Sequence, residues 1–252
     1  MNLCLKSKKI LVVGGSKGIG EGIVIGFARE SCKIINVARS ENLLVVIGKK
    51  AIEAGAESYA FEVADIMECD TKKFATDLIG KYGLFDVVVH NVGGSLVSRN
   101  HLAGIEDWEY ALKFNALASI DMNSILIPPM IERGSGRIIH ISSISAVMQR
   151  GNPLYASAKT FLNAYVTTVG RKLAPTGVLI CSVMPGAVSF EGGYWDKYVK
   201  EGHTRVDDFL HHHQAVNRFG TPEEIANVVV FMASDKSSFM QATNIPVDGA
   251  NM

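Results

Sequence analysis

The fold of this chain is decided by Ile10-Leu11-Val12-Val13-Gly14-Gly15-Ser16-Lys17-Gly18-Ile19-Gly20. A short apolar run stops at Gly14, and Gly18 and Gly20 open an amphipathic stretch that predicts a helix. Glycine lets the backbone approach a pyrophosphate closely, and the helix N-terminus offers free N–H groups to the anion. The spacing therefore favours a dinucleotide-binding turn over an ordinary tight turn between strand and helix.

Strands and helices alternate along the rest of the chain. Near-continuous apolar runs predict strands at Ile10–Val13, Lys33–Ala38, Ser58–Val63, Asp86–His90, Arg137–Ser142, Val178–Met184 and Asn244–Val247. Amphipathic stretches predict helices at Ile19–Glu30, Leu43–Ala54, Met67–Tyr82, Glu106–Arg133, Pro153–Ala174 and Pro222–Ser234. This alternation predicts an α/β fold: a single-domain, doubly wound (Rossmann-type) parallel sheet of about seven strands with helices on both faces. Within the domain of residues 1–252, residues 1–135 would mainly bind the cofactor and residues 136–252 would carry catalysis.

Composition argues against several classes of protein. Lys+Arg and Asp+Glu both number 25, so there is no electrostatic case for a nucleic acid or an anionic membrane as partner. No apolar run reaches the roughly 18 residues of a membrane-spanning helix, and we see no signal-peptide pattern. The four cysteines are scattered without Cys-x-x-Cys spacing. We therefore expect a cytoplasmic protein without a structural metal.

Tyr155 and Lys159, in Tyr155-Ala-Ser-Ala-Lys159, carry the strongest chemical signal. Four residues make about one helical turn, so the phenol and the ammonium are expected on one helix face. Because a cation beside a phenol favours the phenolate, we expect the pKa of Tyr155 to be lowered toward neutrality. Such a tyrosine can move a proton at a substrate oxygen, while the glycine turn indicates a nicotinamide that carries the hydride. An isolated pair of this kind is usually a solvated helix face, so the interpretation depends on both signals together.

The end of the second predicted strand selects the cofactor. A carboxylate there would bind a ribose 2′-hydroxyl and repel a 2′-phosphate. The strand ends instead with Val37-Ala38-Arg39-Ser40, and Arg39 can pair with a phosphate, as can Lys17 in the glycine turn. NADP(H) is therefore favoured over NAD(H), unless Arg39 is only a solvated loop charge.

With these motifs the chain resembles the short-chain dehydrogenase/reductase family, in its compact branch, over nearly its whole length. Val13 stands where the family's glycine turn usually has Thr, and His90-Asn91-Val92-Gly93 resembles the family's Asn-Asn-Ala-Gly with departures at His90 and Val92. The glycine turn, the end of the second predicted strand and the resemblance together imply the residues that bind the cofactor: Gly14, Ser16, Lys17, Gly18, Ile19, Gly20, Arg39, Ser40, Asp65, Ile66, Asn91, Gly93, Tyr155, Lys159, Pro185, Gly186 and Val188.

The resemblance also implies four catalytic residues: Asn115, Ser143, Tyr155 and Lys159. Tyr155 would be the general acid/base, Lys159 would tune it and hold the nicotinamide ribose, Ser143 would bind the substrate oxygen, and Asn115 would complete the proton relay. The family's usual spacing of thirteen residues before the tyrosine gives Ser142 instead. Aligning the strand gives Ser143, which we prefer because a one-residue slip in a strand reverses its faces whereas loops lose residues easily.

We thus expect an NADP(H)-dependent oxidoreductase acting on a carbonyl or secondary alcohol, with reduction following from the NADP(H) inference. Substrate choice would lie in Ser189–Gln214, which is rich in aromatics and histidines and would form either a lid or a surface subdomain. The family commonly forms tetramers through its two long helices, so a homotetramer, or a homodimer, is expected. A non-catalytic NADP(H)-binding scaffold or redox sensor is the alternative, and epimerase or dehydratase chemistry normally needs a larger C-terminal domain.

Overall fold

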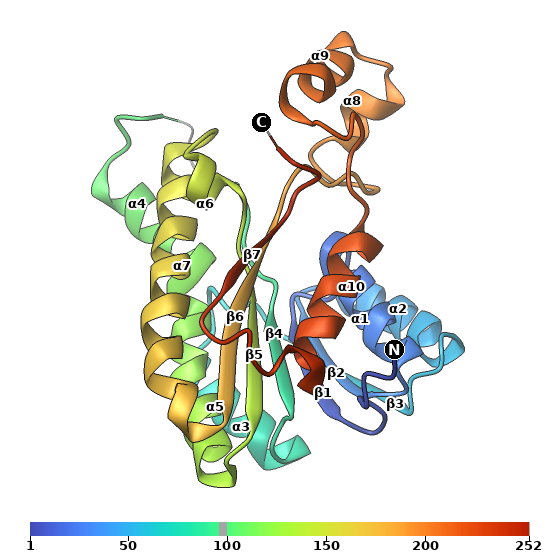
Figure 1. Cartoon of the computed structure of the whole chain (residues 1–252), viewed down its shortest axis with the longest axis vertical. Coiled ribbons are helices and arrows are strands. Elements are labelled where there is room, and N and C mark those ends of the chain that lie inside the picture. The colour runs from blue at the N-terminus through green and yellow to red at the C-terminus, as the bar shows by residue number, and fades with distance from the viewer. Residues whose placement is uncertain (96–99, 252) are drawn as a thin grey trace.

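A computed structural model of the chain, describing residues 1–95 and 100–251, places a seven-stranded sheet at its centre (Figure 1). All neighbouring strands pair in parallel, in the order β3-β2-β1-β4-β5-β6-β7. The strands are β1 (Lys9–Val13), β2 (Lys33–Ala38), β3 (Ser58–Val63), β4 (Val87–His90), β5 (Gly136–Ile141), β6 (Val178–Pro185) and β7 (Asn244–Val247). The predicted doubly wound parallel sheet is confirmed.

Helices cover both faces of this sheet (Figure 1). One face carries α1 (Gly18–Arg29), α2 (Glu41–Glu53) and α10 (Pro222–Ala233). The other carries α3 (Thr71–Tyr82), α5 (Ala118–Arg133) and α7 (Pro153–Leu173). None of the described helices has both the length and the apolar character needed to cross a membrane.

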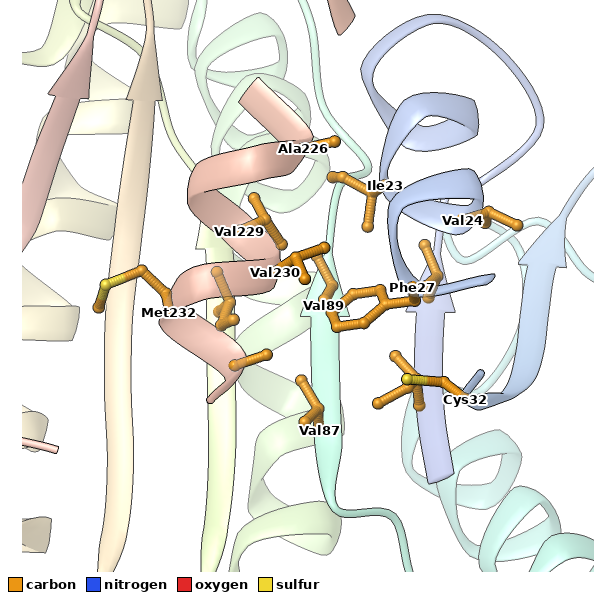
Figure 2. Close-up of a cluster of buried hydrophobic side chains, with 14 of the residues drawn as sticks. Ile23, Val24, Phe27, Cys32, Val87, Val89, Ala226, Val229, Val230 and Met232 are labelled. Carbon is orange, nitrogen blue, oxygen red and sulfur yellow. The ribbon is translucent and has the colours of Figure 1, made fainter. Parts of the chain in front are cut away.

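Alternate residues of each strand enter two separate cores. In β1, Ile10 and Val12 join the core under α1 and α10, whereas Leu11 and Val13 join the core under α3 and α5. Figure 2 shows the first core, where Phe27 of α1 meets Val230 of α10 above the strands. Full burial of a side chain such as Phe27 or Val230 contributes about 1.5–3 kcal/mol to the free energy of unfolding. Burial on both faces explains why the strands read as continuous apolar runs.

Side-chain caps fix where α7 and α10 begin. The Asn152 side chain accepts hydrogen bonds from the backbone N–H groups of Leu154 and Tyr155, at 2.9 and 3.2 Å, with Pro153 at the first helical position. Thr221 and Glu224 form a reciprocal capping box at the start of α10. The first cap sets Tyr155 in the opening turn of α7, and both starts agree with the sequence pattern.

Several helices differ from the sequence expectation. The predicted helix Glu106–Arg133 is divided into α4 (Ile105–Leu112), a π-helical turn η1 (Lys113–Leu117) and α5. The predicted start at Met67 is wrong, because Asp70 accepts hydrogen bonds from the N–H groups of Lys72 and Lys73 and so caps α3. Three short helices were not predicted: α6 (Ser145–Met148), α8 (Asp196–Lys200) and α9 (Thr204–His213).

Candidate active site

A cleft of ≈ 1190 Å³ lies at the carboxyl ends of the central strands and is also lined by residues of α9. This is the edge at which doubly wound sheets bind ligands. Most residues predicted to bind cofactor or to act in catalysis line it: Gly14, Ser16, Lys17, Ile19, Arg39, Ser40, Asp65, Ile66, Asn91, Gly93, Ser142, Ser143, Tyr155, Lys159, Pro185, Gly186 and Val188. Gly18, Gly20 and Asn115 are not among its described lining residues.

The turn from Gly14 to Gly20 has no room for a side chain at any of its four glycines. A Cβ on Gly20 would lie 2.0 Å from the carbonyl oxygen of Gly14, and Gly18, at φ +56°, faces the ring of Phe190 at 2.5 Å from an added Cβ. Lys17 precedes α1 without a side-chain hydrogen bond that caps it. The first-turn N–H groups of α1 thus face the cleft without a side-chain acceptor, as anion binding requires.

Two asparagine side chains hold this turn in place. Asn91 Nδ2 donates to the carbonyl of Gly14 at 2.7 Å, and Asn36 Nδ2 donates to that of Gly15 at 3.0 Å. Asn36 is fully buried in β2 and was not singled out from the sequence, where only its isolation in an apolar strand marks it. These amides support the loop although Val13 supplies no hydroxyl.

The end of β2 presents a cation, as expected, but one that already has a partner. Arg39 Nη1 lies 3.5 Å from Oδ2 of Asp65, and both side chains reach solvent. An exposed pair of this kind contributes at most about 1 kcal/mol. The Asp65 contact therefore does not prevent Arg39 from binding a phosphate.

Ser143, Tyr155 and Lys159 lie together and line the same cleft as the glycine turn. The Ser143 and Tyr155 hydroxyls share a hydrogen bond, and the Lys159 ammonium lies 5.9 Å from the centroid of the Tyr155 ring. Lys159 Nζ donates to the carbonyl of Ile141 at 2.8 Å. The structure thus brings the three predicted side chains into one cluster.

The electrostatics of this cluster differ from the sequence expectation. Burial raises the pKa of Tyr155 above its ordinary value, and the hydrogen bond from Ser143 only opposes that rise. Burial also lowers the pKa of Lys159 to about 7, so the ammonium is partly neutral near neutral pH. The prediction that the pKa of Tyr155 is lowered toward neutrality is wrong, because desolvation of the buried phenol outweighs the hydrogen bond from Ser143.

The two candidate serines have different surroundings. Ser143 Oγ also accepts a hydrogen bond from the N–H of Ser145 at 3.1 Å, at the start of α6. Ser142 Oγ is buried and has no hydrogen-bond partner among the described residues. Only Ser143 is therefore joined to Tyr155.

Asn115 lies in the π-helical turn and fastens the loop after β4. Its Oδ1 accepts from the N–H of Gly94 at 2.9 Å, and its Nδ2 donates to the carbonyls of Ala111 and Gly94 at 3.0 and 3.3 Å. A Cβ on Gly93 would lie 2.8 Å from Asn115 Oδ1 and 2.9 Å from Lys159 Nζ. Gly93 therefore lets the amide and the amine lie against the same loop.

A buried polar cluster lies behind this wall. Asn123 of α5 bridges two stacked imidazoles, accepting from His90 at 2.9 Å and donating to His140 at 3.1 Å. Its Nδ2 also donates to the Tyr165 hydroxyl at 3.2 Å. Burial lowers the pKa of His90 to about 4 and that of His140 well below its ordinary value, so both are neutral. His90, which departs from the family pattern, thus belongs to a buried polar cluster in the protein interior.

The segment 189–214 closes the other end of the cleft with aromatic side chains. Trp195 is buried against Phe209 and Phe219, with ring centroids 4.4 and 5.0 Å apart, and Tyr194 meets it edge-on. Tyr194, Trp195 and Phe209 also line the cleft. The aromatics therefore pack on one another and face the cleft at the same time. Within residues 1–95 and 100–251, no group of three or more His, Cys, Asp or Glu is arranged to hold a metal ion.

Comparison with known proteins gives matches over nearly the whole chain. A family model described as enoyl-(acyl carrier protein) reductase matches residues 13–250. A 3-oxoacyl-[acyl-carrier-protein] reductase of Thermotoga maritima is 28% identical, with 97% of this chain and 98% of that protein covered. An uncharacterized oxidoreductase of Bacillus subtilis is 27% identical, over 99% of this chain and 98% of its own length.

A solved structure shares both the fold and part of the sequence. The L-sorbose reductase of Gluconobacter frateurii, solved with NADPH and L-sorbose, superposes with a TM-score of 0.91 at 25% identity, covering 99% of this chain and 98% of that one. The fold described above thus recurs in a protein whose structure was solved with NADPH and L-sorbose.

Proposed function

Because the chain belongs to the short-chain dehydrogenase/reductase family and is an oxidoreductase of that family, we propose that it interconverts a carbonyl and an alcohol with NADP(H), Tyr155 moving the proton at the substrate oxygen. The observation that carries the proposal is the hydrogen-bonded pair of Ser143 and Tyr155, with Lys159 beside it, facing a glycine turn across one cleft. Placing a proton donor opposite a dinucleotide-binding turn is what carbonyl reduction requires.

The residues of the cleft fit a dinucleotide. The turn from Gly14 to Gly20 and the first-turn N–H groups of α1 would hold the pyrophosphate, and Asp65 and Ile66 would bracket the adenine. Arg39 and Lys17 would bind a 2′-phosphate, which is why we propose NADP(H) as the preferred cofactor and NAD(H) as the weaker one. The NADPH bound in the sorbose reductase supports this preference. When bound, the nicotinamide supplies or accepts the hydride at C4.

The chain's own groups manage the proton and the developing charge. Ser143 would donate a hydrogen bond to the substrate oxygen and orient the Tyr155 hydroxyl toward it. Lys159, whose pKa is about 7, would hold the ribose and be charged when an anionic cofactor lies beside it. That charge would then favour the phenolate. Asn115 holds the loop against which Lys159 lies and would complete the relay to solvent.

A non-catalytic scaffold or redox sensor is not favoured. Such a protein has no need to keep a proton donor, its hydrogen-bonding serine and a buried lysine in one cluster. Burying the lysine costs stability, as its lowered pKa records. Binding of the ribose would account for Lys159 but not for the Tyr155 and Ser143 hydroxyls beside it.

The test is NADPH oxidation by wild type and by Tyr155→Phe against a panel of ketones, acyl thioesters and sugars. Removal of the proton donor should lower kcat by about 10²–10⁴-fold, while the Kd for NADPH stays within about twofold. Lys159→Ala should harm both quantities. Turnover by Tyr155→Phe above roughly a tenth of wild type would contradict the proton-transfer role.

A further inference from the structure

The charges along the cleft are strongly unequal between its two ends. Among the described residues that line it, the only carboxylate is Asp65, at the end near β2, where Arg39 already pairs with it. At the other end, around the segment 189–214, the charged side chains that line the cleft beyond the catalytic cluster are Arg150 and Arg205. A cleft whose end is lined by cations attracts anions, even where, as here, the two arginines are exposed.

Two tyrosine hydroxyls hold the guanidinium of Arg205, in α9, in place without neutralising its charge. Its Nη2 donates to the Tyr194 hydroxyl at 3.1 Å and its Nη1 to the Tyr198 hydroxyl at 3.3 Å. The guanidinium also lies 5.0 Å from the centre of the Tyr198 ring. In the part of the chain that the structure describes, it makes no ion pair with a carboxylate. The phenols orient the guanidinium and leave its full charge for a ligand.

Arg150 brings a second guanidinium to the same end from a different element. It lies in the loop between α6 and α7, and its Nη1 donates to Nδ1 of His213 at 3.2 Å. His213 is the last residue of α9 and also lines the cleft. The bond joins the loop that leads to Tyr155 to the helix that carries Arg205, so both cations border the space in front of the catalytic tyrosine.

We propose that the substrate carries, besides its reacting carbonyl or hydroxyl, a carboxylate or phosphate group that Arg205 and Arg150 bind. This inference rests on the proposed function and names the substrate class of that site. Tyr194, Trp195 and Phe209 would cover the short carbon chain between the two ends of the molecule. Planar guanidinium groups bind both anions in a bidentate manner, so the chemistry alone does not separate carboxylate from phosphate.

The experiment measures binding rather than turnover, so that it does not depend on the reaction. Wild-type protein saturated with NADP⁺, which cannot reduce a ketone, is titrated calorimetrically with acetoacetate, levulinate and 5-oxohexanoate and with their methyl esters. Dihydroxyacetone phosphate and dihydroxyacetone form the phosphate arm. At least one anion should bind at least tenfold more tightly than its neutral partner, because charged hydrogen bonds dominate the difference.

Three variants locate the effect. Arg205→Gln and, independently, Arg150→Gln should reduce the ratio of anion to ester affinity by at least tenfold, and Arg205→Lys should keep part of it. Lys197→Gln is the matched control, since it removes a cation from exposed α8 that is not among the described lining residues. Equal binding of acid and ester by wild type, or no binding of any anion, would overturn the inference. So would weaker NADPH binding by Arg205→Gln with an unchanged anion preference, because the cation would then belong to the cofactor site.

The two proposals fail in distinguishable ways. Reduction of neutral ketones without anion preference would leave the proposed reaction standing and remove the inference about the substrate. Selective anion binding without NADPH oxidation by any compound would contradict the proposed reaction and leave the anion-binding site standing.

Discussion

The hydroxyl of Ser143 hydrogen-bonds the phenol of Tyr155, although Ser142 stands at the family's usual spacing from that tyrosine. Because β5 ends at Ile141, both serines lie just beyond the strand and both line the cleft. The difference between them is therefore one of hydrogen bonding, and it favours the assignment made from the strand over the one made from the spacing.

Ser143→Ala should lower kcat/KM by about 10²-fold or more, since it removes a donor to the reacting oxygen and the group that orients Tyr155. Ser142→Ala should leave kcat/KM within about threefold and keep or slightly raise stability, because the lost hydroxyl is buried without a partner among the described residues. Steady-state kinetics and urea unfolding of both variants check this. The reverse order of activity would restore Ser142 as the catalytic serine.

Arg39→Ala should weaken NADPH by roughly tenfold or more and leave NADH nearly unchanged, since only NADPH carries the 2′-phosphate. Ala38→Asp should go further by adding a ribose acceptor that repels the phosphate. Fluorescence titration of both cofactors against wild type and both variants is the measurement. Tighter binding of NADH than of NADPH by wild type would refute the assignment of NADP(H).

The burial of His90 predicts a pH dependence of folding. Its pKa is lowered to about 4 from 6.5, so between these values the unfolded chain binds a proton that the folded chain does not, and stability rises with pH. This group should remove about 2 kcal/mol of unfolding free energy between pH 7 and pH 5. His90→Asn, which keeps a neutral donor toward Asn123, should flatten the urea-unfolding profile by about that amount. His211→Asn, on exposed α9, should not change the slope, and an unchanged slope in His90→Asn would contradict the prediction.

We also predict a homotetramer, or a homodimer, assembled through α4, α5 and α7. Large apolar side chains are exposed there: Phe161 on α7 at 44%, Tyr110 on α4 at 49% and, in the π-helical turn between α4 and α5, Leu117 at 39%. An interface between copies would require such an apolar surface. Light scattering at micromolar concentration should give a mass above that of the monomer, and Phe161→Asp should lower it. A monomeric wild-type protein would contradict the prediction.

The strands and the glycine turn could be predicted because each leaves a local pattern in the sequence. Strands buried on both faces leave apolar runs, and the glycines of the turn form a recognisable motif. The side chains that exclude a Cβ there, such as Phe190 at Gly18, lie far away in the sequence. The pKa of Tyr155 could not be predicted, because it depends on how deeply the folded cleft buries the phenol. Asn36 and Arg205 were missed for a related reason: their partners, Gly15 and Tyr194, are identified only once the chain is folded.

The division of the predicted helix Glu106–Arg133 could not be predicted for a different reason. The apolar pattern continues through Lys113–Leu117, and a sequence that suits an α-helix there also suits a wider turn. The start of α3 is the opposite case, because the sequence does contain a signal for it. Asp70 is a recognisable capping residue, but the predicted start at Met67 followed the amphipathic pattern that begins before Asp70.

The π-helical turn at Lys113–Leu117 also makes one wall of the cleft sensitive to chain length. Such a turn accommodates one residue more than an α-helical turn, so the helix that follows it is out of phase with the helix before it by about 100°. Deleting a single residue there would let α4 and α5 merge into one regular helix and would swing the Asn115 amide away from Gly94. A more regular helix would thus shape this wall of the cleft less well. Deletion of one residue would therefore harm the cleft more than most substitutions in the same segment.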